Sequence, residues 1–168
     1  MVLILGIGNS LLQDEGIGFH LLNRLRAEKN HWPVEFMDGG TLSFGLSSAI
    51  ESCSHLIVLD AANLHQPAGS IQAFLNNDLD DFLNKPGKTV HEVSLSDLFD
   101  MARLTESLPQ QRAMIAVQPQ EISWGENLTE AVFNSQSQAI ELIESILMDW
   151  EVFTNQQQES ARAREYEY

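Results

Sequence analysis

The chain has 168 residues, of which 43% are hydrophobic; this suffices for one globular domain with a sizeable core and excludes disorder throughout. Twenty-four acidic residues against nine basic ones give a formal charge of −15. Such a charge argues against nucleic acid or an anionic membrane surface as a partner and favours a metal cation or a basic protein segment. No apolar run is long enough to span a bilayer, no signal-like leader is visible, and the single Cys53 can form no internal disulfide. We therefore expect a cytoplasmic protein without membrane insertion.

The N-terminal stretch joins a buried strand to a helix through a glycine-rich turn. Residues 2–5 are purely apolar, as in a strand covered on both faces, and the run G-I-G-N-S-L-L-Q-D-E-G-I-G follows at residues 6–18. Such a turn usually holds a phosphate on its backbone N–H groups, but the carboxylates of Asp14 and Glu15 would repel one. A cation is therefore the better ligand for this turn. We expect Asp14 to act as the N-cap of the helix.

The next elements alternate between strand and helix. Residues 34–37 are typical of a second strand, which ends in the D-G-G-T sequence at residues 38–41. Thr41 is the expected N-cap of a helix that runs to Ile50. Residues 55–60 form a third strand, apolar until its terminal acid. This alternation predicts a doubly wound parallel sheet with right-handed crossovers.

The second half of the chain adds an edge strand, two helices and a last buried strand. Residues 71–75 alternate as a half-exposed strand does, and their short connection favours antiparallel pairing at a sheet edge. Residues 76–88 are polar and are expected to form a loop with at most one helical turn. A capped helix should follow from Ser94. Residues 113–117 are the last strand, and the final helix should begin near Thr129.

Together these elements predict one α/β domain over residues 1–153. Its expected fold is three-layered and doubly wound, with a twisted, mostly parallel sheet of about five strands, one antiparallel edge strand, and helices on both faces. Residues 154–168 are rich in Gln and Glu and show no apolar period, so we expect a polar, disordered tail.

Three of the predicted strands lead into acid-bearing turns: the first leads to Glu15, the second to Asp38 and the third to Asp60. Because the carboxyl ends of parallel strands share one edge of a sheet, these carboxylates should be neighbours. If the strand order is second-first-third, the crevice between the first and third strands is the topological switch point, where ligands bind in open α/β sheets. Structural roles remain open as well, since Asp38 could form an Asx turn and Asp60 could cap the next segment.

Among the five histidines, His91 is the candidate ligand. It is expected on a loop between a Pro-Gly turn and the capped helix, and this loop could reach the carboxyl edge of the sheet. Two carboxylates and one imidazole suit Zn²⁺, Ni²⁺, Mn²⁺ or a similar cation. The sequence contains neither a G-x-S-x-G nucleophile elbow nor an H-E-x-x-H motif, so it predicts neither a serine hydrolase nor an ordinary zincin.

The motif G-x-G-N-x-L-x-x-D-E-G-x-G after an N-terminal strand resembles that of the hydrogenase maturation endopeptidases, and the likeness extends over residues 1 to about 150. The resemblance implies a protease that removes the C-terminal extension of a nickel–iron hydrogenase large-subunit precursor after nickel insertion. It implies that the substrate presents the nickel, and that cadmium or zinc could occupy the same site. By position in the motif, the metal-binding and catalytic residues would be Glu15, Asp60 and His91. Those that recognise the substrate would be Asp38, Gly39, Gly40 and Thr41.

Three other functions share some of these sequence features. A nucleotide-binding module is disfavoured, because Leu11 stands where G-x-G-x-x-G requires its third glycine. A peptidyl-tRNA hydrolase-like enzyme also begins with a strand and a G-x-G-N turn, but it would have to hold tRNA on a chain of charge −15. A non-catalytic chaperone that senses metal in the hydrogenase would fit the same residues.

Overall fold

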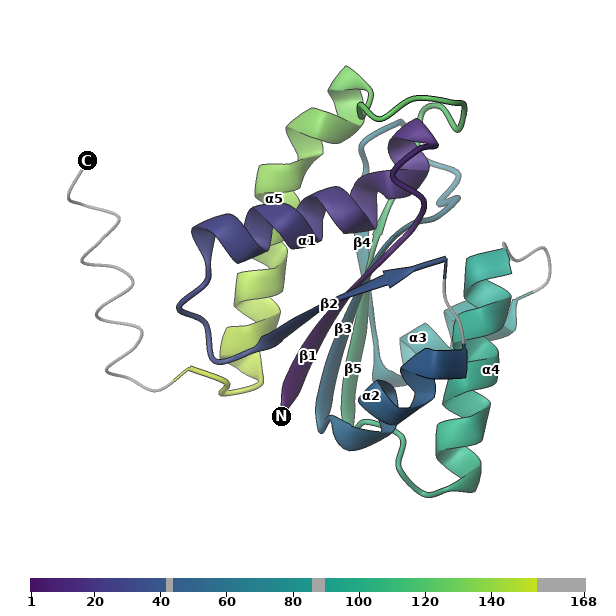
Figure 1. The fold of residues 1–168 in the computed structure, drawn as a ribbon, viewed down its shortest axis with the longest axis vertical. Helices are drawn as coiled ribbons and strands as arrows, with labels where there is room; N and C mark the ends of the chain where they lie inside the picture. The colour runs from purple at the N-terminus through teal and green to yellow at the C-terminus, as the bar shows by residue number, and fades with distance from the viewer. Residues whose placement is uncertain (42–43, 86–89, 154–168) are drawn as a thin grey trace.

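A computed structural model describes residues 1–41, 44–85 and 90–153. Its strands form one five-stranded sheet in the order β2-β1-β3-β5-β4, which is drawn in Figure 1. All pairings are parallel except that of β4 with β5, at the sheet edge. The predicted fold class is confirmed, including the second-first-third order and the antiparallel edge strand. The strands are β1 (Val2–Ile7), β2 (Glu35–Gly40), β3 (His55–Ala61), β4 (Ile71–Leu75) and β5 (Gln111–Val117).

Helices cover both faces of the sheet, as Figure 1 shows. On one face α1 (Ile17–Glu28) and α5 (Glu130–Asp149) pack against strand residues such as Ile4, Ile57 and Ile115. The opposite face, which includes Leu5 and Val58, is covered by the other three helices. Because both faces are buried, the central strands need apolar residues at consecutive positions. The helices of the second face are α2 (Ser47–Ser52), α3 (Asn76–Asn84) and α4 (Val90–Leu104).

Several predicted boundaries were wrong. The helix expected from Thr41 is only α2, preceded by the short 3₁₀ turn η2 (Phe44–Leu46), and its N-cap is Leu46. Residues 76–84, expected as a loop, form the nine-residue helix α3. Buried Leu79 and Leu83, four positions apart, fix this helix against the sheet although most of its other residues are polar.

The helix expected from Ser94 begins four residues earlier, at Val90. Ser94 therefore lies inside α4, and His91 lies in the first helical turn rather than on the preceding loop. Glu92 in this turn favours the early start, because a carboxylate is stabilised by the positive end of the helix dipole.

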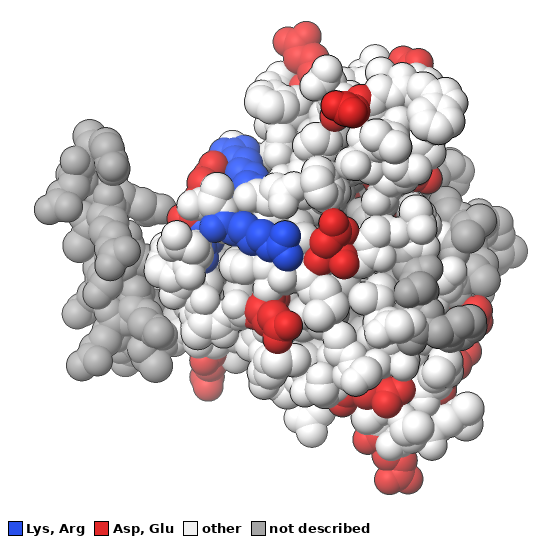
Figure 2. Space-filling view, viewed as in Figure 1, with Lys and Arg blue, Asp and Glu red and all other residues white. Residues whose placement is uncertain are grey.

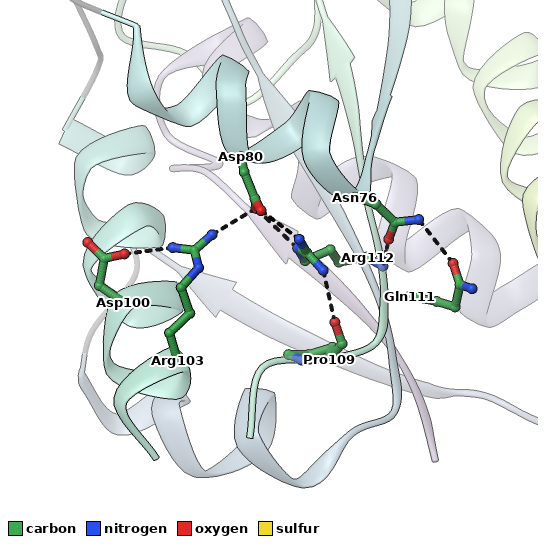
Figure 3. Close-up of polar contacts among 7 residues, drawn as sticks. All are labelled: Asn76, Asp80, Asp100, Arg103, Pro109, Gln111 and Arg112. Atoms are coloured by element: carbon green, nitrogen blue, oxygen red, sulfur yellow. Dashed lines mark hydrogen bonds and ion pairs between the residues drawn. The ribbon is translucent and has the colours of Figure 1, made fainter. Parts of the chain in front are cut away.

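An ion-pair network joins the three elements α3, α4 and β5 (Figure 3). Arg112 is buried and holds the carboxylate of Asp80 with both Nε and Nη2, while its Nη1 donates to the carbonyl of Pro109. Arg103 contacts Asp80 at 3.0 Å and Asp100 at 2.6 Å. Burial raises the pKa of Asp80, but the hydrogen bond and charge of Arg112, together with Arg103, outweigh it and lower the pKa. Since Arg112 is at the start of β5, the network lies at the amino edge of the parallel strands and serves the fold.

Two further expectations concern the chain as a whole. None of the helices in the described ranges is long and apolar enough to cross a membrane. The tail predicted for residues 154–168 lies outside the described residues.

Candidate active site

The backbone just beyond the C-terminal end of β1 requires a glycine at position 8. Gly8 has a φ of +123°, and a Cβ there would lie 1.9 Å from the backbone oxygen of Glu15. The N–H of Gly8 donates to the carbonyl of Gly40 at 2.9 Å. The turns that follow β1 and β2 are therefore bonded to each other, with the backbone of Glu15 packed against them.

Asp14 is fully buried and does not cap the helix that follows it. Its carboxylate accepts the N–H groups of Gln120 and Glu121 at 2.8 and 3.0 Å, and also the N–H and O–H of Thr129. The N-cap of α1 is Gly16, without any side-chain cap, so the role expected for Asp14 was wrong. Asp14 instead fastens the 3₁₀ turn η1 (Gln13–Gly16), which carries Glu15, to the loop that leads into α5.

Asp60 and His91 lie in contact at the same edge. Asp60 is 1% exposed near the end of β3, and its Oδ1 is 3.6 Å from His91 Nδ1. The same oxygen accepts the N–H of Ala61 at 2.8 Å. Asp60 precedes α3 in the chain and His91 follows it. The contact therefore brings a carboxylate and an imidazole together from two separate segments.

The two side chains also change each other's titration. Burial raises the pKa of Asp60, although the hydrogen bond and charge of His91 oppose the rise. The pKa of His91 is raised chiefly by its hydrogen bond to Asp60, against the effect of burial, and further by the charges of Asp60, Glu15 and Glu92. Because the pKa of each group is raised, the Asp60–His91 pair keeps a proton to higher pH than either group would in water.

Glu15 is half-buried and close enough for its charge to act on His91. In the described part of the chain, however, no three His, Cys, Asp or Glu side chains are placed so that they could hold one metal ion. The 3.6 Å between Asp60 Oδ1 and His91 Nδ1 would let both atoms contact one cation, but Glu15 does not complete a set of three with them in this arrangement. The metal site of Glu15, Asp60 and His91 therefore stays a prediction, and this arrangement of side chains does not by itself fit a resident metal.

Asp38 lies at the same level of the sheet, opposite Gly6 in the pairing of β2 with β1. Strand β2 continues through Gly40, beyond the expected end at residue 37, with a shift of register between Gly6 and Ile7. Asp38 is exposed, and its Oδ1 accepts the N–H of Gly40 at 2.9 Å. This is the Asx-type contact that the sequence left open as a structural role for Asp38. Recognition of substrate by residues 38–41 stays a prediction.

Cys53 is an unsuitable nucleophile. It is buried at the C-terminal end of α2, and burial raises the pKa of its thiol to about 11. Since the thiolate is the reactive form, this cysteine serves as a core residue.

Comparison with known proteins identifies the family of this chain. The family model for hydrogenase maturation proteases (HycI) matches residues 19–146. The chain belongs to the hydrogenase maturation protease family. Relatives in this family include the hydrogenase expression/formation protein HoxM of Cupriavidus necator, 29% identical over 89% of this chain and 75% of HoxM. The hydrogenase 2 maturation protease of Escherichia coli is 28% identical over 88% of this chain and 91% of its own length.

Solved structures of this protease family share the fold. The hydrogenase maturating endopeptidase HybD from E. coli superposes with a TM-score of 0.80, at 26% identity, over 88% of this chain and 92% of HybD. HybD from Thermococcus kodakarensis superposes with a TM-score of 0.73 at 25% identity, over 86% of this chain and 97% of that one. The resemblance inferred from the N-terminal motif is thereby confirmed, as is the assignment of the chain as a hydrogenase maturation endopeptidase.

Proposed function

We propose that this protease removes the C-terminal extension of a nickel–iron hydrogenase large-subunit precursor, and that it acts after nickel has been inserted. The observation that carries the proposal is the contact of Asp60 with His91 at the carboxyl edge, with Glu15 acting on the same imidazole. An edge of a parallel sheet is open to a large folded partner, and its three acids, Glu15, Asp38 and Asp60, attract a cation.

In this proposal the nickel belongs to the substrate. Glu15, Asp60 and His91 would recognise it when the precursor docks, and the metal would supply Lewis-acid polarisation near the scissile bond. The contribution of the chain is to bring carboxylate and imidazole to one place, to hold the Glu15 turn through Asp14, and to present Asp38 at the exposed rim. Asp60 and His91 are close enough for both to contact one cation, so recognition of the metal requires Glu15 to move toward this pair.

The test compares nickel-loaded and nickel-free precursor from the same organism, with shortening followed by mass spectrometry. Shortening of the loaded form alone is expected. Equal cleavage of both forms would exclude gating by nickel, and cleavage of neither would favour the non-catalytic chaperone. Glu15→Gln should abolish cleavage while the protein stays folded. Glu141→Gln is the matched control, because it removes one carboxylate from an exposed position of α5.

A second experiment separates substrate recognition from metal binding. Asp38→Asn should slow cleavage of the nickel-loaded precursor but leave binding of cadmium to the isolated protease nearly unchanged, because Asp38 is exposed and bonded to its own turn. Equal loss of both properties would instead assign Asp38 to the metal ligands.

A further inference from the structure

A pocket of about 490 Å³ lies between α1 and the N-terminal half of α5. Its volume is within the range of pockets that hold small ligands. The residues that line it include His20, Arg24, Asn127, Phe133, Asn134 and Ser137.

This pocket contains no carboxylate, although the chain has 24 acidic residues and only nine basic ones. Arg24 lines it, and Figure 2 shows Lys and Arg side chains beside α1, with Asp and Glu side chains directly next to them and over the rest of that face. The guanidinium of Arg24 is held in place by two contacts: Nε donates to Glu28 at 2.7 Å, and Nη2 donates to Ser137 at 3.2 Å. Glu28 forms an ion pair with Arg24 but does not line the pocket. Among the described residues Nη1 of Arg24 makes no hydrogen bond, so Nη1 and Nη2 can still bind a planar carboxylate.

The other lining residues suit a peptide rather than a simple anion. Asn127 and Asn134 are exposed, and each side-chain amide offers both a donor and an acceptor, as a peptide backbone requires. Phe133 is 61% exposed and offers an aromatic face on which an apolar group can pack. Burial lowers the pKa of His20, against the raising effect of the Glu126 backbone, and its buried Nε2 has no hydrogen-bond partner among the described residues. Burial therefore disfavours a second positive charge in the pocket.

We infer that this pocket binds the last residues of a peptide with a free carboxyl terminus, with the carboxylate on Arg24, the backbone on the Asn amides and an apolar side chain on Phe133. The inference rests on the proposed function in one respect: the peptide is the end of the precursor's C-terminal extension. Both α1 and α5 begin at the carboxyl edge of the sheet, where the candidate active site lies. Arg24 is seven residues beyond the start of α1, about 10 Å along its axis. An extended peptide covers this distance with three or four residues.

The test measures binding of two fluorescent peptides to the full-length protein by anisotropy. Both carry the last eight residues of the large-subunit precursor from the same organism, one as the free acid and the other as the C-terminal amide. We expect the free acid to bind at least tenfold more tightly. Arg24→Gln should weaken the acid about tenfold and leave the amide unchanged, whereas Phe133→Ala should weaken both.

Two control variants separate an effect on peptide binding from an effect on folding. Arg26→Gln removes the same charge from the same helix, but Arg26 donates to the carbonyl of Phe36 outside the pocket, so binding of the acid should not change. Ser137→Ala removes the bond between α1 and α5 while Arg24 keeps its charge, and preference for the acid should persist. Equal binding of acid and amide by the wild type, or equal losses in the two arginine variants, would overturn the inference.

Failure of the inference can be told apart from failure of the proposed function. A protein that shortens nickel-loaded precursor but binds acid and amide equally has the proposed function without this pocket's role. A protein that prefers the acid but leaves the precursor intact has the pocket, and assignment of its peptide to a substrate extension would then be wrong.

Discussion

Asp14 accepts two hydrogen bonds from Thr129, which lies 115 residues further along the chain: the N–H bonds Oδ1 and the O–H bonds Oδ2, both at 2.8 Å. Thr129 is the N-cap of α5, and its own side chain makes no cap bond to that helix. The buried Asp14 carboxylate, in the glycine-rich turn, thus accepts hydrogen bonds from the N-cap residue of α5. The turn that carries Glu15 is fixed by this long-range contact rather than by its own sequence.

Asp14→Asn should destabilise the protein by about 3 kcal/mol, because hydrogen bonds to a charged acceptor are strong and the new amide would face N–H donors. For a chain of this size the melting temperature should fall by roughly 6–12 °C. Thr129→Val keeps the backbone N–H and removes only the hydroxyl, so its expected cost is about 1 kcal/mol. Chemical unfolding followed by circular dichroism measures both. If the two variants lose the same stability, the Asp14 carboxylate does not organise this junction.

The network around Asp80 predicts a pH dependence of stability. Its folded-state pKa is lowered chiefly by Arg112, so its contribution is fully present above the unfolded pKa of about 4 and is lost as pH falls through the lower folded value. Asp80→Asn should therefore cost about 2–3 kcal/mol at pH 7, since it leaves the buried Arg112 without its partner. Urea titrations between pH 7 and pH 3 should show wild type and variant converging as the pH falls. A difference that stays constant down to pH 3 would contradict this assignment.

Cys53 should be chemically inert in the folded protein. Burial raises its pKa to about 11, so the thiolate becomes abundant only as the pH approaches that value. A thiol reagent such as DTNB should react at pH 7.5 only after urea is added, while enzymatic cleavage should survive Cys53→Ala if the core tolerates the smaller side chain. Rapid labelling of the native protein would show that the thiol is accessible.

The sheet was predictable because its strands are short apolar runs, and Ile4, Ile57 and Ile115 could only be buried on a two-faced sheet. The ends of the helices were not. Whether residues 76–84 form a helix depends on the packing of Leu79 and Leu83 against distant elements, which a polar composition conceals. The start of α4, and with it the position of His91, was also misjudged, because the capping pattern at Ser94 concealed the acidic first turn that contains Glu92.

The candidate site was predictable as a set of strand-end acids, since Asp38 and Asp60 follow directly from the parallel topology. Its internal contacts were not. The partners of Asp14 lie more than 100 residues away, and no local pattern indicates them. The pocket on α1 and α5 likewise arises from two helices at opposite ends of the chain.

The contact between Asp60 and His91 makes a prediction that can be checked without substrate or metal. The pKa of His91 is raised most by its hydrogen bond to Asp60, and only to a smaller extent by the charge of Glu15. In chelator-treated protein, Asp60→Asn should therefore lower the pKa of His91, measured by NMR titration of the imidazole, and Glu15→Gln should lower it less. His55, in the first position of β3, serves as the internal reference, since its pKa is lowered by burial and by the chain's own N-terminal charge. A larger effect of Glu15→Gln than of Asp60→Asn would mean that His91 pairs with Glu15 in solution, and the geometry of the candidate site would have to be redrawn around that pair.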